Sequence, residues 1–150
     1  MQTQRWTRVS EVDVGGSNGM MWVPAVDIMT VGRIYRIQVL PDGHRQQRWF
    51  PDGVPAAGCT ADGAPTLSRN GSPLVMPELA VGALIGRIGG STADDVVDKE
   101  RMFVFSIGQY CVFQVPEVPK AGALFLTGNE ARAFVNLFKG TLKVSIEQAL

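Results

Sequence analysis

The chain has 150 residues, the length of a single domain; 45% of them are hydrophobic and 19% are charged, which excludes an intrinsically disordered chain. Fourteen basic and fourteen acidic residues cancel to a net charge of zero. This balance argues against a nucleic-acid partner, because such partners are held by an excess of positive charge. Seventeen glycines and nine prolines without a fixed period are typical of many turns between short strands.

The N-terminal segment 1–19 has no apolar block, and we expect it to be an extension before a single domain of residues 20–150. It lacks the pattern of a secretory signal. No stretch of the chain has the roughly 18 apolar residues needed to cross a bilayer. We therefore expect a soluble, cytoplasmic protein with no membrane insertion.

Short apolar or alternating segments predict an all-β fold. In 33–39, Tyr35, Ile37 and Val39 alternate with polar residues, as one face of a half-buried strand requires, and the turn signal Asp42-Gly43 follows. The predicted strands lie at 20–23, 33–39, 84–88, 102–107, 110–115, 123–127 and 141–146. Strands at this spacing indicate a β-sandwich or jelly roll.

The segment 48–73 is long, rich in proline and glycine, and without clear periodicity. Long ordered connections of this kind often carry binding sites. The alternative is a connection packed over one end of the sandwich by its apolar residues. The sequence leaves both interpretations open.

One short helix is predicted at residues 129–138. Ala131, Phe134, Val135 and Phe138 recur at helical spacing. Asn129 is available as the N-cap and Gly140 as the C-terminal stop.

Few residues have a pattern suited to catalysis. His44, the only histidine, lies beside the Asp42-Gly43 turn, and we expect it to be exposed. The glycine-rich segment 86–90 has no helical pattern after it, which favours a turn over a phosphate-binding loop. Four acidic residues in 94–100 lack the spacing of a calcium loop, and we expect them to be solvated.

The two cysteines, Cys59 and Cys111, are too few for a disulfide scaffold and too far apart for a zinc site. We expect Cys111 to be a buried thiol within the apolar segment 110–115. A disulfide between the two cysteines is the alternative.

Four carboxylates could supply the pair that glycoside hydrolysis needs if the fold brought two of them together: Asp52, Asp62, Glu78 and Glu130. The sequence contains no nucleophile elbow, phosphate-cradling glycine loop or histidine metal pair. We therefore expect no enzymatic activity and no cofactor.

Several segments taken together resemble one family. They are residues 26–32, WFPDG at 49–53, GALIGRIG at 82–89, FSIG at 105–108, GALFL at 122–126, Asn129-Glu130 and GTLKVSI at 140–146. Over residues 20–147 the chain resembles the LecA-type (PA-IL) galactophilic bacterial lectins. The resemblance implies a small jelly-roll β-sandwich that binds sugars, and it leaves leaderless export open.

The same resemblance predicts the loss of the family's calcium site. The family has an Asn-Asp pair followed by an Asn-rich loop, whereas this chain has Asn129-Glu130 followed by Leu137 and Phe138. Two apolar side chains supply no oxygen, and calcium needs six to eight oxygens. We therefore expect no metal, and a short helix with Phe134 and Phe138 packed inward.

The sugar-contacting His and Gln of the family also have no counterparts, since Ala57 and Thr60 stand in the corresponding places. The remaining ligand-binding candidates combine an aromatic face with planar polar groups. They are Trp49, Asp52, Asp62, Glu130 and Asn136. The alternative is that Trp49 belongs to the core and the polar residues are solvated.

Two functions follow from this interpretation. The first is a lectin-like domain that binds a glycan without calcium. The second is a non-enzymatic interaction or assembly module that docks onto itself or onto another protein.

Overall fold

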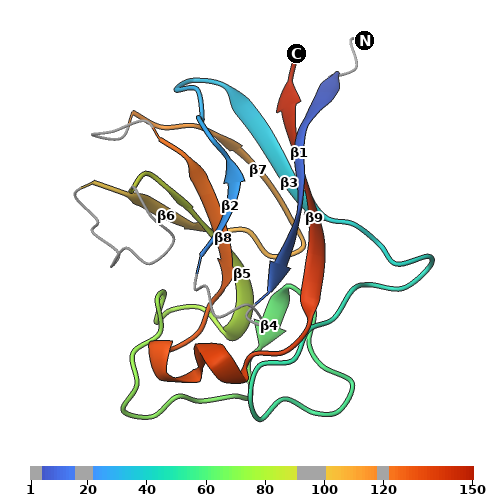
Figure 1. The fold of residues 1–150 in the computed structure, drawn as a ribbon, viewed down its shortest axis with the longest axis vertical. Coiled ribbons are helices and arrows are strands. Elements are labelled where there is room, and N and C mark those ends of the chain that lie inside the picture. The colour runs from blue at the N-terminus through green and yellow to red at the C-terminus, as the bar shows by residue number, and fades with distance from the viewer. Residues whose placement is uncertain (1–4, 16–21, 91–100, 118–121) are drawn as a thin grey trace.

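The computed structural model describes residues 5–15, 22–90, 101–117 and 122–150. Two antiparallel sheets face one another and form a β-sandwich (Figure 1). The all-β sandwich predicted from the sequence is therefore confirmed, while the jelly-roll topology stays a prediction.

The first sheet has four strands in the order β1-β9-β3-β7. They are β1 (Trp6–Gly15), β9 (Thr141–Ala149), β3 (Ile34–Val39) and β7 (Tyr110–Gln114). The second sheet has the order β2-β8-β5-β4, and β6 also pairs with β5. Its strands are β2 (Val23–Val26), β8 (Leu124–Gly128), β5 (Val81–Ile88), β4 (Asp62–Ala64) and β6 (Phe103–Ser106).

The expected N-terminal extension is wrong for residues 6–15, which form β1 at the edge of the first sheet. β1 pairs with β9 from Trp6 opposite Ala149 to Gly15 opposite Thr141. Only Val14 of β1 is fully buried. The strand carries three charged residues, Arg8, Glu11 and Asp13, which explains why its hydrophobic signal is weak.

The main core lies between the two sheets. Alternate residues of β3 and β9, among them Ile37, Val144 and Ile146, are fully buried and pack with Leu84 of β5 and Leu126 of β8. The opposite face of β9 carries polar side chains such as Thr141 and Lys143, whereas that of β7 carries the exposed Tyr110 and Val112. The period of two in the sequence comes from this one-sided burial.

The second sheet is covered on both faces. Its outer face forms a second cluster in which Trp22, Ile85 and Phe125 pack with residues of the 75–79 connection. All eight residues of β5 are buried. Burial on both faces explains why β5 is a continuous apolar run rather than an alternating one.

A 3₁₀ helix, η1 (Arg132–Leu137), and the connections around it close one end of the sandwich, at the bottom of Figure 1. The prediction of a helix at 129–138 is right in place and wrong in its N-cap. η1 begins after Ala131, and no side chain caps it. Asn129 has a different role, described below.

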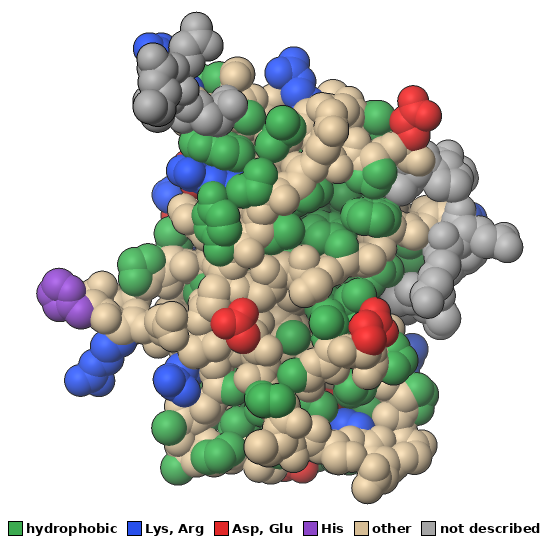
Figure 2. All heavy atoms as spheres, turned by 180° about the vertical axis from the view of Figure 1, so that it is seen from behind, with side chains coloured by type: hydrophobic (Ala, Val, Ile, Leu, Met, Phe, Trp, Pro, Cys, Tyr) green, Lys and Arg blue, Asp and Glu red, His purple; other side chains and the backbone are tan. Residues whose placement is uncertain are grey.

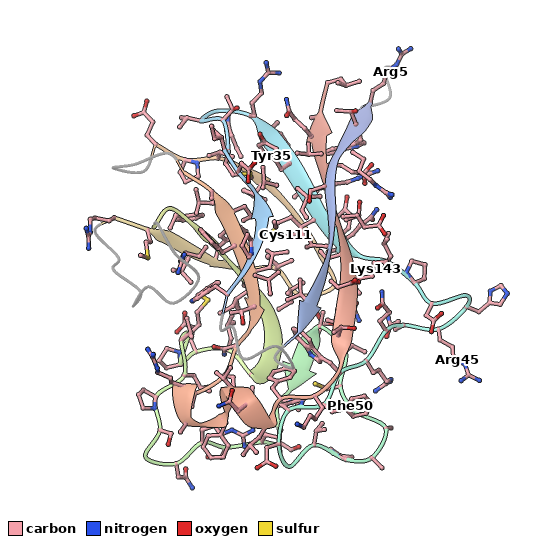
Figure 3. All side chains as sticks on the ribbon, viewed as in Figure 1. Arg5, Tyr35, Arg45, Phe50, Cys111 and Lys143 are labelled. Atoms are coloured by element: carbon pink, nitrogen blue, oxygen red, sulfur yellow. The ribbon has the colours of Figure 1, made fainter. Side chains whose placement is uncertain are left out.

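The connection between β3 and the 48–73 segment projects from the sandwich. Asp42 and Arg45 exchange two backbone hydrogen bonds at its tip. Figure 3 shows Arg45 far from both sheets, and Figure 2 shows the histidine at the end of this projection. The expectation that His44 is exposed is confirmed.

Candidate functional site

Trp49 lies at the closed end of the sandwich and has no exposed surface. Its indole Nε1 donates a hydrogen bond to the Gly82 carbonyl oxygen at 2.9 Å. Its ring meets Phe138 edge-on, with the centroids 4.7 Å apart. A Cβ at Gly128 would lie 2.7 Å from the Phe138 ring and 3.1 Å from the Trp49 ring, so only glycine leaves room for this pair.

Trp49 therefore cannot offer a face to a sugar, and its assignment as a ligand-binding residue is wrong. The expected inward packing of Phe138 is confirmed, since only 3% of it is exposed. The neighbouring Leu137 is 48% exposed. Of the two apolar residues that replace oxygen ligands in the resemblance, only Phe138 seals this end.

Glu130 is buried and paired with Arg69 from the 48–73 segment. The Arg69 guanidinium donates to both carboxylate oxygens, with Nη2 2.8 Å from Oε1 and Nε 3.1 Å from Oε2. The backbone N–H of Ala131 also donates to Oε2 at 2.9 Å. The two side chains are 6% and 1% exposed. The carboxylate is neutralised within the chain, so Glu130 is not available to a ligand.

Arg69 makes two further contacts that tie the closed end together. Its Nη2 donates to the Asp52 carbonyl oxygen at 2.7 Å. Its guanidinium lies 4.3 Å above the ring centroid of Phe134, which is half-buried. Phe134 thus packs under a cation at the boundary of the site rather than in the core.

The buried Asn129 side chain holds the 75–80 connection rather than capping a helix. Its Oδ1 accepts from the Met76 N–H at 2.9 Å. Its Nδ2 lies within 3.2 Å of three carbonyl oxygens, those of Met76, Leu79 and Ala80. These bonds fix the connection that covers the outer face of the second sheet.

An open depression of about 370 Å³ lies beside Arg69. It is lined by Pro65, Leu67, Ser68, Arg69, Leu74, Pro77, Leu79, Ala80 and Val81. Asp52 is not one of the lining residues, but its carbonyl oxygen accepts a hydrogen bond from Arg69, which is. The exposed Asp52 carboxylate makes no hydrogen bond with any part of the chain that the structure describes.

The other candidate polar residues do not join this depression. The Asp62 Oδ1 accepts from the Gln109 N–H at 3.2 Å, at the turn between β6 and β7. Glu78 lines a separate groove of about 280 Å³ with Met102 and Phe103. Asn136 is exposed on η1. Of the four carboxylates considered for hydrolysis, Asp62 and Glu78 lie apart from the others, and only Asp52 and Glu130 belong to residues that share a contact, the guanidinium of Arg69.

Both cysteines are free thiols, so the alternative of a Cys59–Cys111 disulfide is wrong. The expectation that Cys111 is buried is wrong, because Cys111 is only half-buried, whereas Cys59 is buried. Figure 3 shows Cys111 and Tyr35 in the space between the sheets. Burial raises the pKa of both thiols, which keeps them protonated and unreactive.

Among residues 5–15, 22–90, 101–117 and 122–150, no group of three or more His, Cys, Asp or Glu side chains is placed to hold a metal ion. The acidic residues of 94–100 lie outside the described residues. No helix within these same ranges is long and apolar enough to cross a membrane.

Two arginines important to the structure were missed in the sequence. Arg69 was passed over within an irregular segment. Arg87 is fully buried on β5, where its guanidinium lies 4.2 Å from the Phe125 ring centroid and 4.9 Å from that of Trp22. A charged residue inside the run LIGRIGG was the available signal, since arginine is almost never fully buried unless it is paired.

Compared with known proteins, the chain matches no protein-family model and no curated protein. The resemblance to galactophilic lectins therefore rests on the segments quoted above.

Proposed function

We propose that this protein is a carbohydrate-binding domain that works without calcium and without catalysis. The observation that carries the proposal is the open depression beside Arg69, next to the exposed residue Asp52, whose carbonyl oxygen accepts from Arg69. Its volume of about 370 Å³ lies within the usual range of small-molecule sites. The resemblance to sugar-binding sandwiches supports the same class of ligand.

The lining of the depression suits a sugar ring. A pyranose has apolar C–H faces and a rim of hydroxyl groups. Leu67 and Leu74 of the lining offer apolar surface. The exposed Asp52, whose carbonyl is bound by Arg69, is proposed to bring its carboxylate to the rim, where it offers two acceptors for hydroxyl donors. Ser68 and Asn70, which are exposed and hydrogen-bonded to one another at 2.7 Å, add polar groups close by.

The Arg69–Glu130 pair supports binding without a metal. In the resemblance, the residue at position 130 belongs to the calcium site. Here its carboxylate receives three hydrogen bonds from Arg69 and one from the backbone of Ala131. The guanidinium of Arg69 thus supplies, beside Glu130, the positive charge that a calcium ion would supply in the resemblance.

Glycan-array screening followed by titration calorimetry of the best ligand tests the proposal. We expect binding to be the same with calcium and with EDTA. Substituting Asp52→Ala removes the proposed acceptor and should weaken binding about ten-fold, the value of one charge-assisted hydrogen bond. Asp13→Ala, an exposed carboxylate on β1, is the matched control and should leave binding unchanged. Binding that EDTA abolishes, or an array without any ligand, would overturn the proposal.

A further inference from the structure

The sheet edges of this protein differ in how they are protected from pairing with other strands. Exposed edges are usually protected by charges, proline, bulges or short length. β1 has a register shift between Arg8 and Ser10 and three charged residues, and β2 has Pro24 followed by a register shift. β4 has only three residues, one of them Asp62.

β7 has none of these features. Its sequence, YCVFQ, contains no charge and no proline. Its register with β3 runs without a shift from Ile34 opposite Gln114 to Gln38 opposite Tyr110. It is the terminal strand of the first sheet. β7 is therefore a regular, neutral strand at an edge that no segment within 5–15, 22–90, 101–117 or 122–150 pairs with.

The backbone groups that β7 leaves open can be named. Val115 N donates to the Arg33 carbonyl, and the Gln109 carbonyl accepts from Val39 N, so odd-numbered residues bond toward β3. In an antiparallel pair the residues between them point the other way. The N–H and C=O groups of Tyr110, Val112 and Gln114 thus face outward. No described segment pairs with this side of β7.

The side chains beside this edge are apolar and exposed. Tyr110 is 54%, Val112 48% and Ile34 40% exposed. The one cation in this row, Arg36 opposite Val112, is paired with Glu147 at 2.9 Å. The edge is therefore apolar and carries no net charge.

We infer that β7 pairs with β7 of a second copy of this chain, antiparallel about a two-fold axis at Val112. The two-fold places Val112 opposite the partner's Val112 and Tyr110 opposite the partner's Gln114. The N–H and C=O groups of these residues all point away from β3. The two residues of each pair can therefore exchange two N–H···O=C hydrogen bonds across the interface. Because β7 has no charged residue, pairing it with a second β7 brings no like charges together. The two four-stranded sheets then form one continuous sheet across an isologous interface.

This interface lies on β7, whereas the proposed sugar site is bordered by residues of 48–73, so the two proposals fail independently. Sedimentation analysis of the full chain over a micromolar to millimolar range should show a monomer–dimer equilibrium. Val112→Lys places two like charges opposite one another and should weaken dimerisation about ten-fold or more. Val112→Pro removes the outward N–H at the two-fold and should do the same.

Val9→Lys is the matched control, because Val9 is similarly exposed, at 41%, on the opposite edge strand. It should leave the equilibrium unchanged. Amide hydrogen exchange supplies a measurement without substitution: exchange at Tyr110, Val112 and Gln114 should slow as the protein concentration rises. A monomer at every concentration, a dimer insensitive to both Val112 variants, or exchange at these amides independent of concentration would overturn the inference.

Discussion

Two regions of this protein contain the same arrangement, an arginine held between an aromatic ring and a glutamate. At the closed end of the sandwich Arg69 lies over Phe134 and bonds Glu130. On the outer face of the first sheet Arg36 lies 4.6 Å from the Trp6 ring centroid and bonds Glu147 at 2.9 Å.

The surroundings of the two pairs differ. The first pair is 6% and 1% exposed, and the second is 26% and 13% exposed. Water can solvate an arginine or a glutamate of the second pair if its partner is lost, whereas the first pair leaves no such route. The energetic role of these two ion pairs is therefore set by their access to water more than by their geometry.

Breaking the buried pair should have the largest effect. Arg69→Met leaves the Glu130 carboxylate buried without its partner and should lower the free energy of unfolding by about 3–5 kcal/mol. Urea denaturation followed by tryptophan fluorescence measures the loss. The double variant Arg69→Met/Glu130→Gln should recover much of it, because the unpaired charge is gone. A loss no larger than that of Arg36→Gln would contradict the contrast between the two pairs.

Removing the buried ring of Phe138, which packs against Trp49, should have the next largest effect. Phe138→Ala creates a cavity against Trp49 and should lower the free energy of unfolding by about 3 kcal/mol. Leu137→Ala is the matched control at an exposed position and should cost less than about 0.5 kcal/mol. Equal losses in the two variants would show that Phe138 does not seal this end.

The exposed pair should have the smallest effect, seen as a dependence on pH. The hydrogen bond from Arg36, followed by its charge, holds the pKa of Glu147 below its ordinary value of 4.5. Because the folded pKa is depressed, the stabilisation is fully present above the ordinary value and is lost as the pH falls through the folded value.

Glu147→Gln should therefore reduce the loss of stability between neutral and acidic pH, measured by urea denaturation at each pH. Arg36→Gln should reduce it by the same amount, since the shift arises from their contact. An unchanged pH dependence in both variants would show that the pair contributes nothing to acid sensitivity.

The sequence predicts the strands of one-sided sheets well, because burial of one face imposes a period of two, as in 33–39 and 141–146. It also predicts the inward packing of Phe138. It failed at Arg69–Glu130 and at Asn129 with the 75–80 connection, because these contacts join residues about fifty or more apart in the chain and leave no local pattern. Trp49 was ambiguous for a similar reason, since an aromatic residue in an irregular segment looks the same whether it faces solvent or core.

The side chain of Asn129 has one more consequence. Three carbonyl oxygens converge on its amide nitrogen, much as oxygens surround a bound cation. An amide side chain does not titrate, and a chelator cannot remove it as it removes a bound metal ion. The 75–80 connection, which covers the outer face of the second sheet, is therefore held by the uncharged amide of Asn129. This attachment should depend neither on pH nor on the concentration of divalent cations.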